Sequence, residues 1–200
     1  MKVITFLTMI ILVSLFADKA EVIENIKAAQ KNVERGDLKE AKSDLQMALS
    51  AIEQMQFEKL KEYLPKAPVG WNEEKATGSN MGSLGLGMMA GTTASKNYYK
   101  EEGETYRSVN IDLVLNSPLV GTLKMFLNNP AMLSMDPEQK LIRLSDGRKV
   151  LMKYNADDMS GEISIIADTS VITINGSMVD EDTLKMFANM IKVDEILNNL

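Results

Sequence analysis

The sequence contains neither cysteine nor histidine. Without cysteine there are no disulfide bonds, no thiolate nucleophile and no cysteine for lipid attachment after a leader, and the usual zinc ligands are absent. Without histidine the chain also lacks the side chain that most often serves as a general base near neutral pH. We therefore expect no catalysis by a thiol, an imidazole or a zinc-bound water.

Basic residues are also outnumbered, with 22 Lys and Arg against 28 Asp and Glu and a net charge of −6. Neutralisation of phosphates supplies most non-specific affinity for nucleic acids, so an acidic chain without a basic cluster is a poor nucleic-acid binder. The apolar share of 45% and the charged share of 25% are typical of a folded globular protein. The composition therefore predicts a globular protein with no nucleic-acid partner.

The chain begins with a short apolar stretch. Lys2 precedes an uncharged run from Val3 to Phe16, which at roughly 14 residues is shorter than the ~20 that a spanning helix needs. Leu15-Phe16-Ala17 is a tolerable cleavage site. We predict that residues 1–17 are a secretory signal peptide and that the protein is periplasmic or secreted; the alternative is a buried or uncleaved anchoring helix.

Residues 18–66 have the periodicity of two helices. Gly36 suits the left-handed position after the first helix, and Asp37 can cap the second, which Pro65 ends after Leu64. The apolar residues at helical spacing are Val22, Ile26, Ala29 and Val33, followed by Leu38, Ala41, Leu45, Ala48, Leu49 and Ile52. We expect an antiparallel helical hairpin with a single seam formed by these residues.

The turn of this hairpin carries a resemblance. The segment from Val33 to Ala41, followed by Ala48-Leu49, resembles the turn of a tetratricopeptide-type helix pair. The resemblance covers about 30 residues and occurs once, whereas such repeat proteins need roughly three stacked units to bury a continuous core. It therefore implies a helix pair that docks on the rest of the chain or on a partner, and it does not imply the peptide-binding groove of repeat arrays.

Residues 67–95 differ in composition from the rest of the chain. After Trp71 they hold five glycines among methionines and leucines. The spacing of these glycines does not fit a dinucleotide-binding loop, and neither a strand before them nor an acidic residue at the required distance is present. We predict a Gly/Met-rich linker or loop, and the functional alternative to a plain linker is contact with a protein partner or a membrane surface. The candidate contact residues are Trp71, Met81, Leu84, Leu86, Met88 and Met89.

Residues 96–200 alternate in a way that predicts a sheet. A first strand is expected at Tyr98–Glu101, followed by a half-buried strand over 109–115 and four short apolar runs between Lys140 and Ile174. One short helix is expected to start with Ser117 as its N-cap and Pro118 at its first position, and to end at Asn129. A second has Leu184, Phe187, Ala188 and Ile191 on one face. The predicted class is α+β: a mostly antiparallel sheet of about six strands covered by one or two helices.

Three features of residues 65–200 carry a second resemblance: Trp71 after a Pro/Gly-containing start, the Gly/Met-rich segment, and the Ser117-Pro118-Leu119 helix that ends at Asn129-Pro130. In these features the region is similar to exported bacterial envelope proteins of uncharacterised activity. The resemblance implies a bacterial envelope protein and brings no activity or site residues with it.

Two groups of residues could take part in catalysis or metal binding. The carboxylates at Asp157-Asp158 and at Asp180–Asp182 are interpreted as a turn and a helix cap, since a hydrolase would need two carboxylates facing each other across a cleft. The 15 methionines could supply soft Cu(I) ligands, most densely at Met88-Met89 and at the pair Met132 and Met135, but methionine is also a gap-filling core residue. We assign no catalytic residue, no metal site and no cofactor.

These observations favour a non-enzymatic exported envelope protein that binds a protein partner. The alternative is a protein that binds a small ligand, such as a lipid, another hydrophobic molecule or copper. A hydrolase that uses carboxylates comes third.

Overall fold

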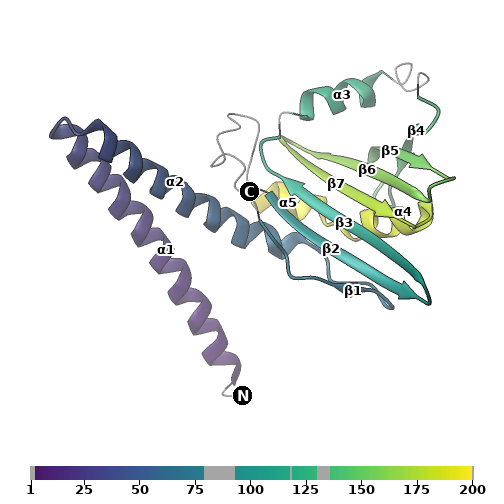
Figure 1. Cartoon of the computed structure of the whole chain (residues 1–200), viewed down its shortest axis with the longest axis horizontal. Coiled ribbons are helices and arrows are strands. Elements are labelled where there is room, and N and C mark those ends of the chain that lie inside the picture. Colours follow the sequence, from purple (N-terminus) through teal and green to yellow (C-terminus); the bar gives the residue numbers. More distant parts are fainter. Residues whose placement is uncertain (1–2, 79–92, 118, 130–135, 200) are drawn as a thin grey trace. The chain divides into compact units, whose positions relative to one another are not determined.

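The computed structural model describes residues 3–78, 93–117, 119–129 and 136–199 (Figure 1). The chain divides into two compact units, Met1–Lys59 and Leu60–Leu200. The first, here called the hairpin unit, consists of two helices, and the second, the sheet unit, is an antiparallel sheet with helices packed on it. The predicted α+β class, with a helical hairpin before a mostly antiparallel sheet, is confirmed.

The hairpin unit is formed by α1 (Val3–Glu34) and α2 (Leu38–Leu60). Gly36 has a φ angle of +80°, and the Asp37 carboxylate accepts a hydrogen bond from the Glu40 amide at 3.3 Å, as the turn residues predicted. Helix α1 begins at Val3 rather than near Ala20, because no helix-breaking residue separates the apolar stretch from the helix that follows. Within the described residues, no helix is long and apolar enough to cross a membrane.

Helix α2 was expected to run to Leu64, but it ends at Leu60 and a 3₁₀ turn, η1 (Lys61–Tyr63), follows. Leu64 is extended, with φ −72° and ψ 123°. The physical reason is Pro65, because a proline disfavours helical geometry at the residue before it.

The sheet unit contains seven strands in the order β1-β2-β3-β7-β6-β5-β4, and all neighbours are antiparallel. The strands are β1 (Asn72–Glu73), β2 (Thr93–Glu102), β3 (Thr105–Val114), β4 (Gln139–Arg143), β5 (Lys149–Asn155), β6 (Ser160–Ala167) and β7 (Ser170–Ser177). Strand β2 begins five residues before the expected Tyr98, and β1 lies inside the segment expected to be a linker. Neither β1 nor the first five residues of β2 have an alternating apolar pattern, so only the second half of β2 was predicted.

One face of the sheet holds the core. Rows of directly paired residues cross it, for example Ile111 opposite Ile174, which in turn is opposite Ile163, and all three are fully buried. Helix α4 (Glu181–Met190) covers this face through Leu184, Phe187 and Ala188. The expected helical face is therefore confirmed, and a further helix, α5 (Val193–Asn199), buries Val193 and Ile196.

Helix α4 starts at a side-chain cap. The carboxylate of Asp180 accepts a hydrogen bond of 2.8 Å from the Thr183 amide. The hydrogen bonds with Thr183 hold the pKa of Asp180 below its usual value. The interpretation of this acidic group as a helix cap is confirmed for Asp180.

The segment after α2 belongs to the sheet unit. Leu60 and Leu64 are buried, and the Pro65 carbonyl accepts hydrogen bonds from the Tyr98 hydroxyl at 2.6 Å and from Lys96 Nζ at 3.1 Å. Lys96 also forms an ion pair with Glu73 on β1 at 3.0 Å. These contacts explain why the unit boundary lies at Lys59, seven residues before the expected end of the hairpin region at 66.

Helix α3 (Val120–Asn128) packs over β5 and β6. Ser117 does not cap it: the N-cap is Leu119, and the Ser117 hydroxyl instead accepts a hydrogen bond of 3.3 Å from the Leu119 amide. The expected cap at Ser117 is therefore wrong, because the helix starts later than the Ser-Pro signal suggested. No residue of α3 is buried, so this helix covers its face of the sheet only loosely.

Candidate functional site

The helices of the hairpin unit meet through small and polar side chains. Ala29 of α1 and Ala41 and Ala48 of α2 are 2–3% exposed. Beside them, Asn32 donates a hydrogen bond of 2.8 Å to the Asp44 carboxylate. Alanine contacts let two helices approach closely but bury little apolar area. The seam therefore stabilises the hairpin less than a seam of leucines would.

The large aliphatic side chains expected in that seam lie beside it instead. They are 38–68% exposed, and they are Ile26, Val33, Leu38, Leu45, Leu49 and Ile52. Ile23, which was not among the expected seam residues, is 53% exposed beside them. The expectation that they pack between the helices is therefore wrong. The physical reason is that the apolar arc of each helix is wider than the strip that one partner helix can cover.

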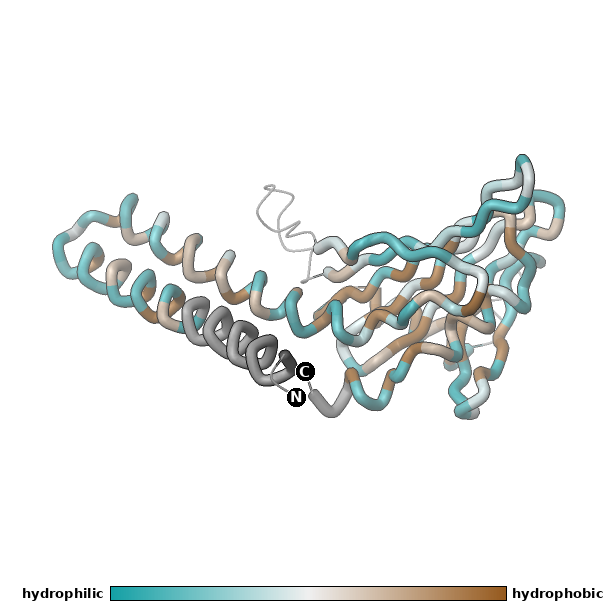
Figure 2. Tube along the Cα trace, turned by 90° about the horizontal axis from the view of Figure 1, so that it is seen from below, coloured by the Kyte–Doolittle hydropathy of each residue, from teal (hydrophilic) through white to brown (hydrophobic). Residues whose placement is uncertain are grey.

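These aliphatic side chains share one side of the hairpin unit, which we call the aliphatic face. A groove of about 320 Å³ connects the two helices on this side, with Ile23 of α1 and Ile52 of α2 in its lining. Helical spacing of 3–4 residues places Ile26 on the side of Ile23, and Leu45 and Leu49 on the side of Ile52. Figure 2 shows apolar positions recurring along both helices in the part that is coloured.

Charge is distributed unequally around the hairpin unit. Lys19 and Lys59 line the groove, and helical spacing places Lys42 between Leu38 and Leu45 on the aliphatic face. The opposite side has a depression of about 490 Å³ lined mostly by polar residues, including Glu21, Ser50 and Gln54, together with Met47. The groove on the aliphatic face thus combines apolar side chains with two lysines and has no acidic residue among the described residues of its lining, although the whole chain is acidic.

The sequence-predicted contact residues are not brought together in the described part of the chain. Trp71 is partly buried and packs edge-on against Phe187, with ring centroids 5.0 Å apart. Met81, Leu84, Leu86, Met88 and Met89 lie outside the described residues, as does the Met132–Met135 pair. Trp71 therefore contributes to the cover of the core, and the contact role of the others stays a prediction.

The candidate acidic residues take part in the local structure of the sheet unit. The amides of Asp157 and Asp158 both donate to the Asn155 side chain, which closes a turn after β5. Glu181 forms an ion pair with Lys140 at 2.5 Å, and the hydrogen bond from Lys140 lowers its pKa. Among the described residues, no group of His, Cys, Asp and Glu could hold a metal ion. Asp157 and Asp158 thus take part in a turn through their backbone amides, whereas the carboxylates of Asp180 and Glu181 serve in a helix cap and in an ion pair.

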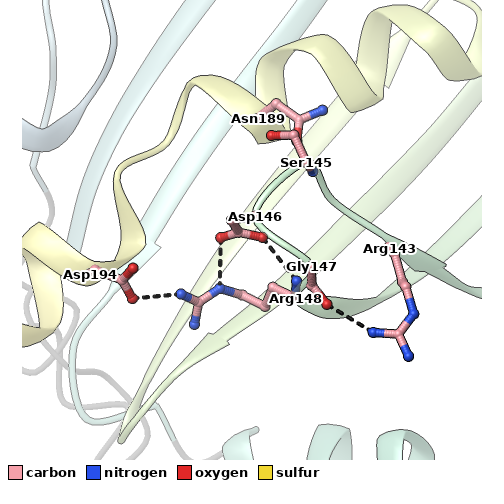
Figure 3. Close-up of polar contacts among 7 residues, drawn as sticks. All are labelled: Arg143, Ser145, Asp146, Gly147, Arg148, Asn189 and Asp194. Carbon is pink, nitrogen blue, oxygen red and sulfur yellow. Dashed lines mark hydrogen bonds and ion pairs between the residues drawn. The ribbon is translucent and has the colours of Figure 1, made fainter.

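A second cavity, of about 280 Å³, lies between the β4–β5 turn and the helices α4 and α5 (Figure 3). Arg148 forms ion pairs with Asp146 at 3.3 Å and with Asp194 at 2.7 Å. The Ser145 amide donates to the Asn189 side chain at 2.7 Å. Because the charged groups at this cavity neutralise one another, they join the turn to the helices and leave little charge to bind a ligand.

The aliphatic face is therefore the surface whose apolar residues are least explained by burial within the fold. Sequence periodicity identified six of its seven residues, all except Ile23, but assigned them to a buried seam. Their exposure is known only from the structure. Comparisons with protein-family models, curated proteins and solved structures found no match for this chain.

Proposed function

We propose that this protein is a non-enzymatic, exported binding protein of the cell envelope that docks a protein partner on the aliphatic face of its hairpin unit. The observation that carries the proposal is the exposure of seven large aliphatic side chains on one side of two helices. Contiguous exposed apolar surface of this kind marks interaction sites in soluble proteins. The alanine seam leaves that surface free for a partner.

The partner favoured by the geometry is an amphipathic helix with acidic flanks. A groove between two helices accepts the side-chain ridge of a third, and its floor of Val22, Ile23, Ile52 and Met55 suits apolar anchors spaced at helical intervals. Lys19 and Lys59 beside the groove attract carboxylates on both sides of such a helix. A second copy of this chain fits less well, because docking by the same face would bring lysines against lysines.

A membrane surface is also a poorer fit than a protein helix. Helices that lie in a bilayer interface carry aromatic anchors in their apolar face. Between Lys19 and Lys59 the chain has one aromatic residue, Phe57, which is not among the exposed large apolar side chains. Gln30 and Lys42 also interrupt the aliphatic face near its middle.

The proposal is tested with two synthetic peptides and the full chain. Both peptides are amphipathic helices of three heptads with leucine at the apolar positions, one flanked by glutamate and the other by lysine. We expect the acidic peptide to bind about tenfold more tightly than the basic one, measured by fluorescence anisotropy at low salt. The double variant Leu49→Glu with Ile52→Glu should weaken binding about tenfold or more, because it places charge among the apolar anchors.

A matched control adds the same two charges to the opposite side of α2. Ser50→Glu with Gln54→Glu lies in the polar depression, so binding of the acidic peptide should stay near that of the unaltered chain. Equal affinity for the two peptides, or equal loss in both double variants, would refute docking on the aliphatic face. Sedimentation as a dimer that Leu49→Glu dissociates would make a second copy the occupant. Stronger binding to anionic vesicles than to the acidic peptide would replace the protein partner with a membrane.

The export part of the proposal rests on the apolar stretch at the start of the chain. Secretion with cleavage after Ala17 predicts that protein recovered from a cell-envelope fraction begins at Asp18, which N-terminal sequencing detects. Recovery of the chain in the cytoplasm with residues 1–17 intact would contradict export. In living cells, a photo-crosslinking residue at position 49 should trap the partner, and the same residue at position 50 should not.

A further inference from the structure

The sheet unit has a second face, which the core helices α4 and α5 do not cover. Residues on β2, β3 and β7 alternate between the two faces, so Tyr98, Val109 and Ile174 point to the core and their chain neighbours point away from it. At one end of this second face the apolar residues Leu151 and Val171 are buried, and α3 contacts the strands β5 and β6. Beyond them the face is polar.

This polar face consists of rows of directly paired residues that cross several strands. One row runs Asn97, Asn110, Asn175, Glu162 and Lys153 across β2, β3, β7, β6 and β5. The next row holds Ser95, Asp112, Thr173 and Ser164. The rows are rich in amides and hydroxyls, both of which can donate and accept hydrogen bonds.

Hydrogen bonds within the face fix some of these groups and leave others for a ligand. Asn110 donates to Asp112 at 2.7 Å, and Ser95 donates to the Asn110 carbonyl oxygen at 3.1 Å. Within the described part of the chain, the side chains of Asn97 and Thr173 have no hydrogen-bond partner. The face therefore offers a prearranged network with unused donors and acceptors beside it.

Two tyrosines extend the polar face at the end of β2 and β3 that lies next to the turn between them. Tyr99 and Tyr106 stack with ring centroids 5.9 Å apart and an angle of 18° between the ring planes. Pairing places both on the polar face, because Tyr99 is opposite Ser108 and Tyr106 is opposite Glu101. Tyr106 is 50% exposed, so the pair presents an aromatic surface to a ligand at this end of the face.

We propose that this polar face binds a linear, uncharged polysaccharide made of pyranose units. Sugar hydroxyls and acetamido groups need many hydrogen-bond partners of both kinds, and the C–H face of a pyranose ring stacks on an aromatic ring such as Tyr106. Strands lie about 4.8 Å apart, close to the length of one pyranose ring, so side chains in a row can meet successive sugars. The carboxylates of Asp112 and Glu162 disfavour phosphate-rich ligands such as nucleic acids.

The test uses hexasaccharides of β-1,4-linked glucose and of β-1,4-linked N-acetylglucosamine, added separately to the full chain labelled with nitrogen-15. We expect at least one to shift backbone amide signals in β2, β3, β7 and β6, with weaker effects elsewhere. A preference for the acetylated sugar identifies an acetamido-containing glycan as the ligand, and a preference for glucose identifies a simple glucan. Both results support the proposal.

Variants then locate the site. The double variant Asn97→Ala with Tyr106→Ala, and separately Thr173→Val, should weaken binding of the preferred hexasaccharide, the first about tenfold. Lys192→Ala, on the α4–α5 connection away from the polar face, is the matched control and should leave binding unchanged. Fluorescence of Trp71 during thermal unfolding verifies that each variant is folded. Absence of shifts with both sugars, shifts on another surface, or equal binding by all variants would overturn the proposal.

Discussion

Replacing Gly176 by alanine tests the packing of α4 on the sheet. Gly176 on β7 is opposite Gly161 on β6, and the side chain of Leu184 lies over this pair. A Cβ atom at Gly176 would lie 2.7 Å from Leu184 Cδ2 and 3.3 Å from Leu184 Cγ, and it would also clash with Val179 Cγ2. Because α4 and the sheet are held by the buried residues around this contact, the helix cannot move away freely.

The expected cost follows from overpacking. Inserting a methyl group into a well-packed core typically costs about 1–3 kcal/mol. For a chain of this size, a loss of about 2 kcal/mol lowers the unfolding temperature by about 6 °C. Trp71 is the only tryptophan, and its contact with Phe187 makes its fluorescence a reporter of the sheet unit. Thermal or urea unfolding followed at this residue measures the change.

Two further variants make the result interpretable. Gly121→Ala in α3 has no atom within 4 Å of the new Cβ, so it should be neutral or stabilise by about 0.5–1 kcal/mol. Combining Gly176→Ala with Leu184→Ala removes one of the two obstructing side chains and leaves Val179 in place, so the pair should cost less than the sum of the two single changes. A Gly176→Ala variant as stable as the unaltered chain, or strictly additive costs, would refute the close packing argued here.

Three other predictions concern the sheet unit. Arg148→Ala breaks two partly exposed ion pairs, so it should cost less than about 1 kcal/mol but speed proteolysis within α5, as limited digestion and mass spectrometry would show. Unchanged digestion would show that Arg148 does not hold α5 to the β4–β5 turn. Because the pKa of Asp180 is lowered in the folded state, this carboxylate adds stability above its unfolded pKa, and that stability is lost as the pH falls through its folded pKa. The free energy of unfolding in urea should therefore differ less between pH 3 and pH 7 in Asp180→Asn than in the unaltered chain. An equal difference in both proteins would assign the acid sensitivity to other carboxylates. A fragment of residues 60–200 should melt cooperatively and at a higher temperature than residues 96–200, which lack the Pro65 contact with Tyr98 and the Trp71 contact with Phe187. Identical melting temperatures would show that these two contacts add no stability.

Several elements were predictable from the sequence because they depend on local chemistry. Gly36 tolerates the positive φ angle of the hairpin turn, Asp180 can accept the amide hydrogen bond at a helix start, and the spacing of Leu184, Phe187 and Ala188 requires one apolar helical face. The β6–β7 turn and the strands around it likewise follow from short apolar runs separated by turn residues.

The candidate docking site was only half predictable. Periodicity picked out Ile26, Leu45 and Leu49 as apolar positions, but it could not say which part of a wide apolar arc faces the partner helix. That choice depends on how closely the two helices approach, which the alanines Ala29, Ala41 and Ala48 allow. The polar face of the sheet was not predictable at all, since residues as distant in the chain as Asn97 and Asn175 come together only through strand order.

The sequence by itself determined the α+β class, the hairpin turn and the helix that covers the sheet, because each depends on residues close together in the chain. The tertiary structure decided the strand order, the place of Leu60–Pro65 and Trp71 in the sheet unit, and the exposure of the aliphatic face. The physical reason is that these outcomes depend on competition between distant segments for the same buried surface. Local periodicity shows which side chains are apolar, and tertiary packing alone decides which of them become buried.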